Sequence, residues 1–127
     1  MNLIVAMIRA EKLEQVRHAL LDAPLSLMYA SEVQDVWRQT LARYRGHEYR
    51  VSEPRLRLEI VVVNEMATAG IVDAIVNEAF ADQTGPQGNG DIFVMQLNDW
   101  IPIRPGVQSR QVQTSQSGEP TRAVTRI

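Results

Sequence analysis

RLRLEIVVV, residues Arg55–Val63, is the stretch that decides the fold. Its first half alternates charged and apolar side chains, and its second half is continuously apolar. Alternation with a period of two is typical of a β-strand with one covered face, and a short apolar run is typical of a strand buried on both faces. We therefore predict a strand over 55–63.

The chain before this strand predicts two more strands with a helix between them. Asn2–Ile8 (NLIVAMI) is an unbroken apolar run, too short for a typical helix. From Glu11 to Asp22 the apolar residues recur at helical spacing, and Ala23-Pro24 ends that pattern. Leu25–Val36 alternates again, which predicts the second strand.

The chain after 55–63 repeats the order of helix and strand. Met66–Asp82 has an apolar side at helical spacing, and Asp91–Leu97 (DIFVMQL) is the fourth predicted strand. Trp100–Arg104 (WIPIR) is predicted as a short edge element, since its proline excludes a central position. Residues 107–127 are polar and without periodicity, and we expect a flexible tail. A tail that folds over a ligand or a partner is the alternative.

This order predicts an α+β domain over residues 1–106 with a β-α-β-β-α-β, ferredoxin-like sandwich. Such a fold has a four-stranded antiparallel sheet with both helices on one face. The other face would leave Met7, Tyr29, Val61 and their neighbours in water. A bare apolar sheet face is an association or a binding surface, so we expect an oligomer.

Length and composition exclude several classes of protein. The chain has 127 residues, 45% of them apolar, and a net charge of −2, which fits one domain without a basic field for nucleic acid. No apolar stretch reaches the roughly 20 residues of a membrane helix, and the N-terminus does not resemble a signal peptide. The absence of cysteine excludes disulfides and thiolate sites and fits a cytoplasmic protein.

Three features have the residue types for ligand binding. The glycine-rich turn TGPQGNG, residues 84–90, allows backbone N–H groups to form an anion-binding nest, although an ordinary turn is the alternative. Residues 37–54 are rich in arginine and lack an apolar face, which predicts a long, mobile and functional loop or a merely solvated one. Glu59 can accept hydrogen bonds from a sugar hydroxyl if it is half-buried.

Catalysis finds little support in the sequence. His18 and His47 have no metal-ligand spacing, and no Ser-His-acid set is visible, so we assign no catalytic residue and no metal site. Tyr29 and Phe93 are the only plausible base-stacking residues, which argues against nucleic acid as a partner.

Several segments taken in order resemble the PII signal-transduction family over residues 1–106. They are IRAEKLEQVRHAL, SEV at the end of the second strand, RQ at the loop base, YRGHEYRV in the loop, RLEIVVV and TGPQGNGDIFV. The resemblance implies a homotrimer that binds adenine nucleotides in clefts between subunits. Residues 37–54 would be the T-loop, which engages a membrane transporter or a metabolic enzyme.

The resemblance also implies site residues. The nucleotide would be bound by Met7, Tyr29, Asp35, Trp37, Arg38, Gln39, Glu59, Val61, Gly88, Asn89, Gly90, Asp91 and Arg104. A small-anion effector would lie at the loop base, beside Gln39 and Arg55. Tyr49 matches a tyrosine that some relatives carry modified, but the loop is shorter here.

Four departures from the family's pattern alter the expected ligand. Asp91 and Pro102 stand where the family usually has a lysine and an arginine, which should disfavour a triphosphate. We therefore expect ADP or AMP to bind better than ATP, without an essential Mg²⁺. Trp37 replaces a small residue and Arg55 replaces a lysine, which places 2-oxoglutarate in doubt and favours a smaller anion such as bicarbonate.

The predicted function is thus a non-enzymatic sensor of adenine nucleotide. The alternative within the family is a nitrogen-regulatory PII protein that binds ATP and 2-oxoglutarate. Alternatives outside that function are a small ferredoxin-like enzyme, a metal-binding trimer, and a structural trimer without a ligand.

Overall fold

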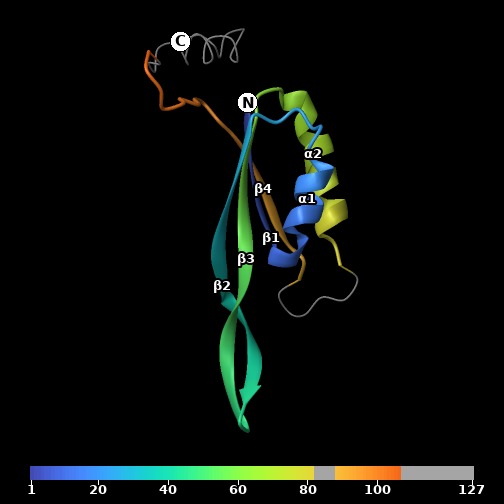
Figure 1. Ribbon diagram of the computed structural model, residues 1–127, viewed down its shortest axis with the longest axis vertical. Coiled ribbons are helices and arrows are strands. Elements are labelled where there is room, and N and C mark those ends of the chain that lie inside the picture. Colours follow the sequence, from blue (N-terminus) through green and yellow to red (C-terminus); the bar gives the residue numbers. More distant parts are fainter. Residues whose placement is uncertain (82–87, 107–127) are drawn as a thin grey trace.

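The computed structural model describes residues 1–81 and 88–106, and within the long hairpin it describes only the backbone of 38–42 and 49–53. Four strands and two helices follow one another in the predicted order (Figure 1). Each helix is entered through one short 3-10 turn. The elements are β1 (Asn2–Arg9), η1 (Ala10–Lys12), α1 (Leu13–Ala19), β2 (Leu27–Tyr44), β3 (His47–Val62), η2 (Glu65–Ala67), α2 (Thr68–Ala79) and β4 (Gly90–Gln96).

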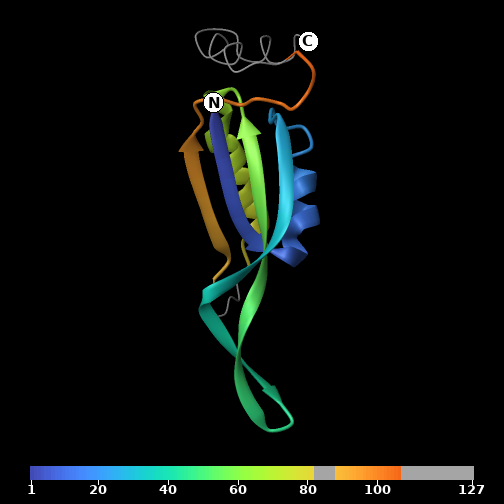
Figure 2. The ribbon, with the colours of Figure 1, turned by 90° about the vertical axis from the view of Figure 1, so that its left-hand side faces the viewer.

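The strands form one antiparallel sheet in the order β2-β3-β1-β4. Both helices lie on one face of this sheet, and the opposite face is open in the view of Figure 2. This arrangement confirms the predicted α+β, ferredoxin-like fold. It also makes β4 and β2 the edge strands, with β1 and β3 between them.

The hydrophobic core lies between the sheet and the helices. The even-numbered residues 4–8 of β1 and 56–62 of β3 face it, and fully buried examples are Ile4, Leu58 and Ile60. They pack against Val16 of α1 and Ile75 of α2, which are also fully buried. Burial of one such side chain stabilises the fold by roughly 1.5–3 kcal/mol.

The open face of the sheet is less bare than the sequence predicts. Tyr29 is 67% exposed and Met7 is half-buried, but Val61 is only 6% exposed. The prediction that Val61 faces water is therefore wrong for the single chain. Residues 100–104 line the same hollow as Val61, and they have no strand pairing, so the predicted edge element is also wrong. Pro102 lacks the N–H group that such pairing needs.

The predicted irregular loop over 37–54 is a β-hairpin. β2 and β3 continue past the sheet as a two-stranded ribbon, visible at the lower end of Figure 1. Arg45 and Gly46 form its turn, with φ of 52° and 82°. Positive φ at both central residues is typical of a type I′ turn, whose twist matches that of the strands.

The sequence conceals this ribbon because the described side chains along it face solvent. Val36, Trp37 and residues 43–48 are exposed, so no alternation of polar and apolar residues arises. The cross-strand pair Arg43–Glu48 is joined by an ion pair of 2.7 Å, and the Arg45 guanidinium lies 5.2 Å from the centre of the Tyr44 ring. The strands lose register between Asp35 and Gln39, at the root of the ribbon.

Helix boundaries differ from the prediction by a few residues. α1 ends at Ala19 rather than Asp22, and α2 begins after Asn64 caps the preceding 3-10 turn with a 3.0 Å bond from the Met66 N–H. Residues 82–87, which hold most of the predicted glycine-rich turn, and the predicted tail at 107–127 lie outside the described residues.

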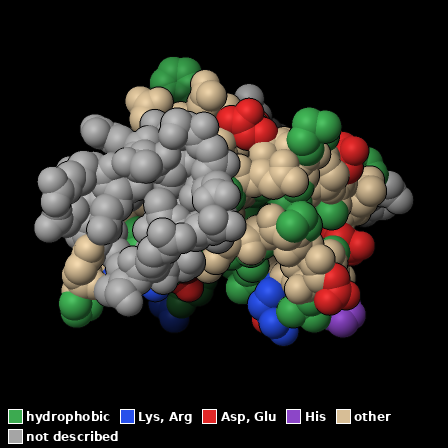
Figure 3. Space-filling view, turned by 90° about the horizontal axis from the view of Figure 1, so that it is seen from above, with side chains coloured by type: hydrophobic (Ala, Val, Ile, Leu, Met, Phe, Trp, Pro, Cys, Tyr) green, Lys and Arg blue, Asp and Glu red, His purple; other side chains and the backbone are tan. Residues whose placement is uncertain are grey.

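No helix in the described ranges is long and apolar enough to cross a membrane. In the end-on view of Figure 3, the side chains that are not grey mix apolar and charged types without one large patch of either.

Candidate functional site

The described end of the glycine-rich turn, residues 88–90, leads into β4. The backbone of β1 leaves no room there for a side chain on Gly90. Gly88 and Gly90 have φ of 70° and 129°. A Cβ on Gly90 would lie 1.8 Å from the Met7 carbonyl oxygen, so only glycine fits beside β1. The Asn89 Oδ1 accepts a 2.9 Å hydrogen bond from the Ala81 N–H and so ties the end of α2 to the start of β4. This bond holds the Asn89 side chain in place and leaves its Nδ2 group as a hydrogen-bond donor.

Two arginines hold the carbonyl of Gly88. Arg9, the last residue of β1, donates from Nη2 at 3.1 Å, and Arg55 of β3 donates from Nη2 at 3.0 Å. Arg55 is only 4% exposed. The sequence predicts Arg55 at the loop base as a residue that binds a small anion, and the structure also brings it to the glycine-rich turn. The sequence prediction missed Arg9, because only the register of β1 against β4 brings it to the turn.

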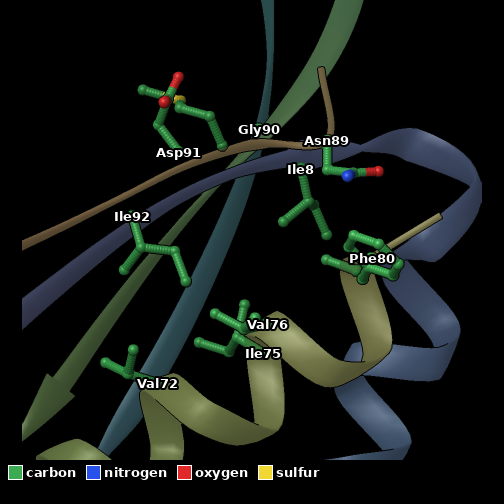
Figure 4. A pocket seen from close by; sticks show the side chains of 11 residues that line it. Ile8, Val72, Ile75, Val76, Phe80, Asn89, Gly90, Asp91 and Ile92 are labelled. Carbon is green, nitrogen blue, oxygen red and sulfur yellow. The ribbon is translucent and has the colours of Figure 1, made fainter. Parts of the chain in front are cut away.

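Met7 and Asp91 are direct partners across β1 and β4, on the open side of the sheet. Asp91 is exposed at the mouth of the turn. Both residues, with Asn89 and Gly90, also border a hollow of about 310 Å³ between the sheet and α2 (Figure 4). The rest of that lining is apolar: Ile8, Val72, Ile75, Val76, Ala79, Phe80 and Ile92.

A second group of predicted residues lines a different hollow, on the open face. Tyr29, Glu59, Val61 and Arg104 surround about 650 Å³ together with apolar neighbours. Tyr29 and Glu59 are direct cross-strand partners. The Glu59 side chain is 40% exposed and lies 3.3 Å from the Arg57 Nε, so it is half-buried and paired with a cation.

The root of the ribbon contains the remaining predicted residues. The Asp35 Oδ1 accepts a 3.0 Å hydrogen bond from the Trp37 N–H, which holds the local bend. The Trp37 side chain is 90% exposed and lines neither hollow. Arg38 and Gln39 belong to β2, and their side chains lie outside the description.

The predicted site residues thus fall into two groups on one chain. We call Met7, Arg55, Gly88, Asn89, Gly90 and Asp91 the glycine half, and Tyr29, Glu59, Val61 and Arg104 the open-face half. The glycine half offers backbone N–H groups and buried guanidinium charge, which suit an anion. The open-face half offers an aromatic ring, a carboxylate and apolar walls, which suit a nucleoside.

The described residues contain no group of three or more His, Asp and Glu side chains that could hold a metal ion.

Comparison with known proteins assigns the chain to a family. Residues 1–107 match the family described as P-II, nitrogen regulatory protein P-II. The nitrogen regulatory protein P-II 2 of Methanothermobacter thermautotrophicus is 39% identical over 114 residues, which cover 87% of this chain and 96% of the relative. The Haemophilus influenzae P-II protein is 39% identical over 112 residues, covering 86% and 96%, and that of Synechocystis sp. is 38% identical over 109 residues, covering 84% and 94%. The chain therefore belongs to the P-II family of signal-transduction proteins.

Proposed function

We propose that this P-II protein is a homotrimeric sensor that binds ADP or AMP in preference to ATP. The nucleotide would lie in clefts between subunits and would set the state of the hairpin that meets a protein partner. Members of the P-II family are trimeric regulators that interact with partner proteins, and they are not enzymes. The identity of the ligand is the part that this proposal adds.

The split of the site into two halves supports a cleft between subunits. Four residues of the glycine half line one hollow of the chain, and the open-face half lines another: the four are Met7, Asn89, Gly90 and Asp91. A nucleotide has an anionic end and an apolar, hydroxyl-bearing end, which match the two halves in chemistry. If the glycine half of one subunit faces the open-face half of the next, one ligand contacts both.

Asp91 is the observation that carries the preference for a shorter phosphate chain. Its exposed carboxylate directly follows Gly90, at the mouth of the phosphate-binding turn. Each added phosphate brings negative charge toward this carboxylate. Like charges at a partly screened site cost up to about 1 kcal/mol, and more where water is excluded.

Calorimetric titration with AMP, ADP and ATP, each with and without Mg²⁺, tests the proposal. We expect ADP or AMP to bind more tightly than ATP. Asp91→Lys should shift the ratio of ATP to ADP affinity toward ATP by about tenfold, because it replaces repulsion with attraction. Asp22→Lys, on an exposed residue beyond α1, is the charge-matched control and should leave the ratio unchanged. Tighter binding of ATP by the unmodified protein would overturn the proposal.

A small anion would bind beside Gln39 and Arg55 in the same proposal. Arg55 is 4% exposed as a residue, and a poorly hydrated guanidinium group binds strongly to an anion that reaches it. Bicarbonate is a candidate much smaller than 2-oxoglutarate, and adding it during the ADP titration should tighten ADP binding. No change with bicarbonate would remove this effector and leave the nucleotide proposal standing.

The names of the relatives favour a second candidate. Proteins 37–39% identical to this chain are called nitrogen regulatory proteins. The second candidate is therefore a nitrogen-regulatory protein that binds Mg-ATP and 2-oxoglutarate together. Titration of 2-oxoglutarate in the presence of Mg-ATP separates the two, since only the second candidate predicts saturable, ATP-dependent binding.

Residues 37–54 are the surface that we assign to the protein partner, a membrane transporter or a metabolic enzyme. The described side chains at the tip, residues 43–48, are all exposed. They project beyond the sheet, away from the helices (Figure 2). A cytoplasmic location is part of this proposal.

A further inference from the structure

We propose that Arg9 and Arg55 act as a pair of positioning residues, which hold the Gly88 carbonyl so that the amides after it stay available for an anion. This inference rests on the proposed function, because it assigns the regulation of the same site. It adds a residue, Arg9, and a role for both arginines that does not require either to touch the ligand.

The geometry is one acceptor shared by two directly paired residues, Arg9 and Arg55, of the neighbouring strands β1 and β3. The Nη2 atoms of Arg9 and Arg55 lie 3.1 Å and 3.0 Å from one carbonyl oxygen. A carbonyl oxygen has two lone pairs, so these two donors fill its capacity. The two bonds hold the Gly88 carbonyl toward β1 and β3. They therefore fix the orientation of the peptide that leads from Gly88 into Asn89 and Gly90.

Both donors are placed firmly enough to impose a conformation. The Arg9 side chain is 17% exposed, and Arg55 as a whole is 4% exposed. Hydrogen bonds from charged donors are roughly twice as strong as neutral ones. Gly88 needs such support, because its φ of 70° is one of several conformations open to a glycine.

Arg55 also links the turn to the hairpin. It follows Pro54 directly, where β3 leaves the ribbon and enters the sheet, and it pairs with Val33 of β2. A shift at the root of the ribbon therefore moves the backbone that carries this guanidinium. The same bond would couple ligand binding to the ribbon. A ligand that moves Gly88 would change the hydrogen bond to Arg55, and with it the position of the backbone at the root of the ribbon.

Arginine-to-methionine and arginine-to-lysine variants of each residue test the inference in the full chain. Methionine keeps the length of the side chain without its donors, whereas lysine keeps one donor group and the charge. Arg17→Met is the matched control, because Arg17 is exposed on α1 and, in the part of the chain that the structure describes, bonds to its helix neighbour Glu14. The readouts are ADP affinity, thermal stability, and hydrogen exchange without ligand at the Ala81 amide, which is bonded to the Asn89 Oδ1.

We expect Arg9→Met and Arg55→Met each to weaken ADP binding about tenfold, the effect of one lost charge-assisted bond. Exchange at the Ala81 amide should rise in the same variants, because Asn89 is held less firmly, while exchange in the centre of β1 stays slow. Lysine should restore most of the affinity at position 9. Arg17→Met should match the unmodified protein in every readout.

Unchanged affinity and unchanged exchange in both methionine variants would overturn the inference while leaving the nucleotide proposal intact. If the unmodified protein does not bind ADP at all, the proposed function fails and the exchange data alone decide. Faster exchange at the Ala81 amide would then still support the positioning role, and equal exchange would overturn it. A general loss of stability that raises exchange throughout the sheet equally would also overturn it.

Discussion

Gly90 is the residue with the least freedom to change. Its missing side chain is required because a Cβ would overlap the Met7 carbonyl, and its φ of 129° is strained for any other residue. Gly90→Ala should therefore lower the free energy of unfolding by more than about 2 kcal/mol, measured by urea denaturation.

Gly70→Ala is the matched control for that change. Gly70 lies in α2, and nothing lies within 4 Å of the position that its Cβ would take. Alanine there should raise stability by up to about 1 kcal/mol, because it reduces the entropy of the unfolded chain. Equal effects of the two substitutions would show that the contact with Met7 does not restrict position 90.

Glu65 makes one surface contribution to stability depend on pH. The α-amino group of Met1 donates to its Oε1 at 2.7 Å, and this bond and the attraction between the charges lower the pKa of Glu65. A carboxyl group whose pKa is lower in the folded state stabilises that state above its unfolded pKa, and the contribution is lost as the pH falls through the folded pKa. Glu65→Gln should thus cost some stability at pH 7 and none at pH 2.

Denaturant titrations of both proteins at these two pH values measure the difference. Glu78→Gln, an exposed glutamate of α2, is the control and should show no comparable pH-dependent gap. A gap for Glu65→Gln that persists at pH 2 would assign its effect to something other than the ionised carboxylate.

Residues of the candidate site differ in how far the sequence reveals them. Gly88, Gly90 and Arg55 stand in a motif or directly beside a strong strand signal, so their neighbourhood could be predicted. Arg9 follows an apolar run and has no pattern of its own. Its role depends on the pairing of β1 with β4, which is a property of the sheet as a whole.

At the scale of elements, the hairpin is the part most separable from the body. None of its described side chains between Val36 and Pro54 is buried, and the core lies between the sheet and the helices. Deleting Leu41, Ala42, Tyr49 and Arg50 removes two complete cross-strand pairs and keeps the side chains of the tip on their original faces.

The shortened hairpin should leave the body unaffected. We expect a melting temperature within about 2 °C of the unmodified protein, since little apolar burial is lost, and ADP affinity within about twofold. Binding to the protein partner should be abolished, because the tip no longer reaches it. A large drop in melting temperature would mean that the ribbon contributes to the fold.

The success of sequence prediction also varied by element. β1, β3 and the two helices could be predicted because burial imposes a period of two or 3.6 on their apolar residues. The ribbon and residues 100–104 could not, since solvent exposure in the first and Pro102 in the second leave no such pattern. The one local sequence signal for the ribbon is Arg45-Gly46, a dipeptide that allows a type I′ turn but does not require one.

At the scale of the whole molecule, the two halves of the site imply an order of subunits. Contact of a glycine half with the next subunit's open-face half is a head-to-tail contact, which closes into a ring when the rotation permits. Three chains of 14.3 kDa give a mass of about 43 kDa, which light scattering during gel filtration should report. A monomer under these conditions would remove the basis for a shared cleft.

Mixed trimers give the sharper test of that arrangement. Tyr29→Ala with Glu59→Gln damages the open-face half and leaves the glycine half intact, whereas Arg55→Met damages only the glycine half. Trimers made of either variant alone should bind ADP weakly.

In a head-to-tail ring, any mixture of the two variants contains one cleft in which both contributing halves are intact. Co-expressed and co-purified mixed trimers should therefore recover one tight ADP site per trimer by calorimetry. If both halves belonged to the same subunit, mixing would recover no tight site, and the model of a cleft between subunits would be wrong.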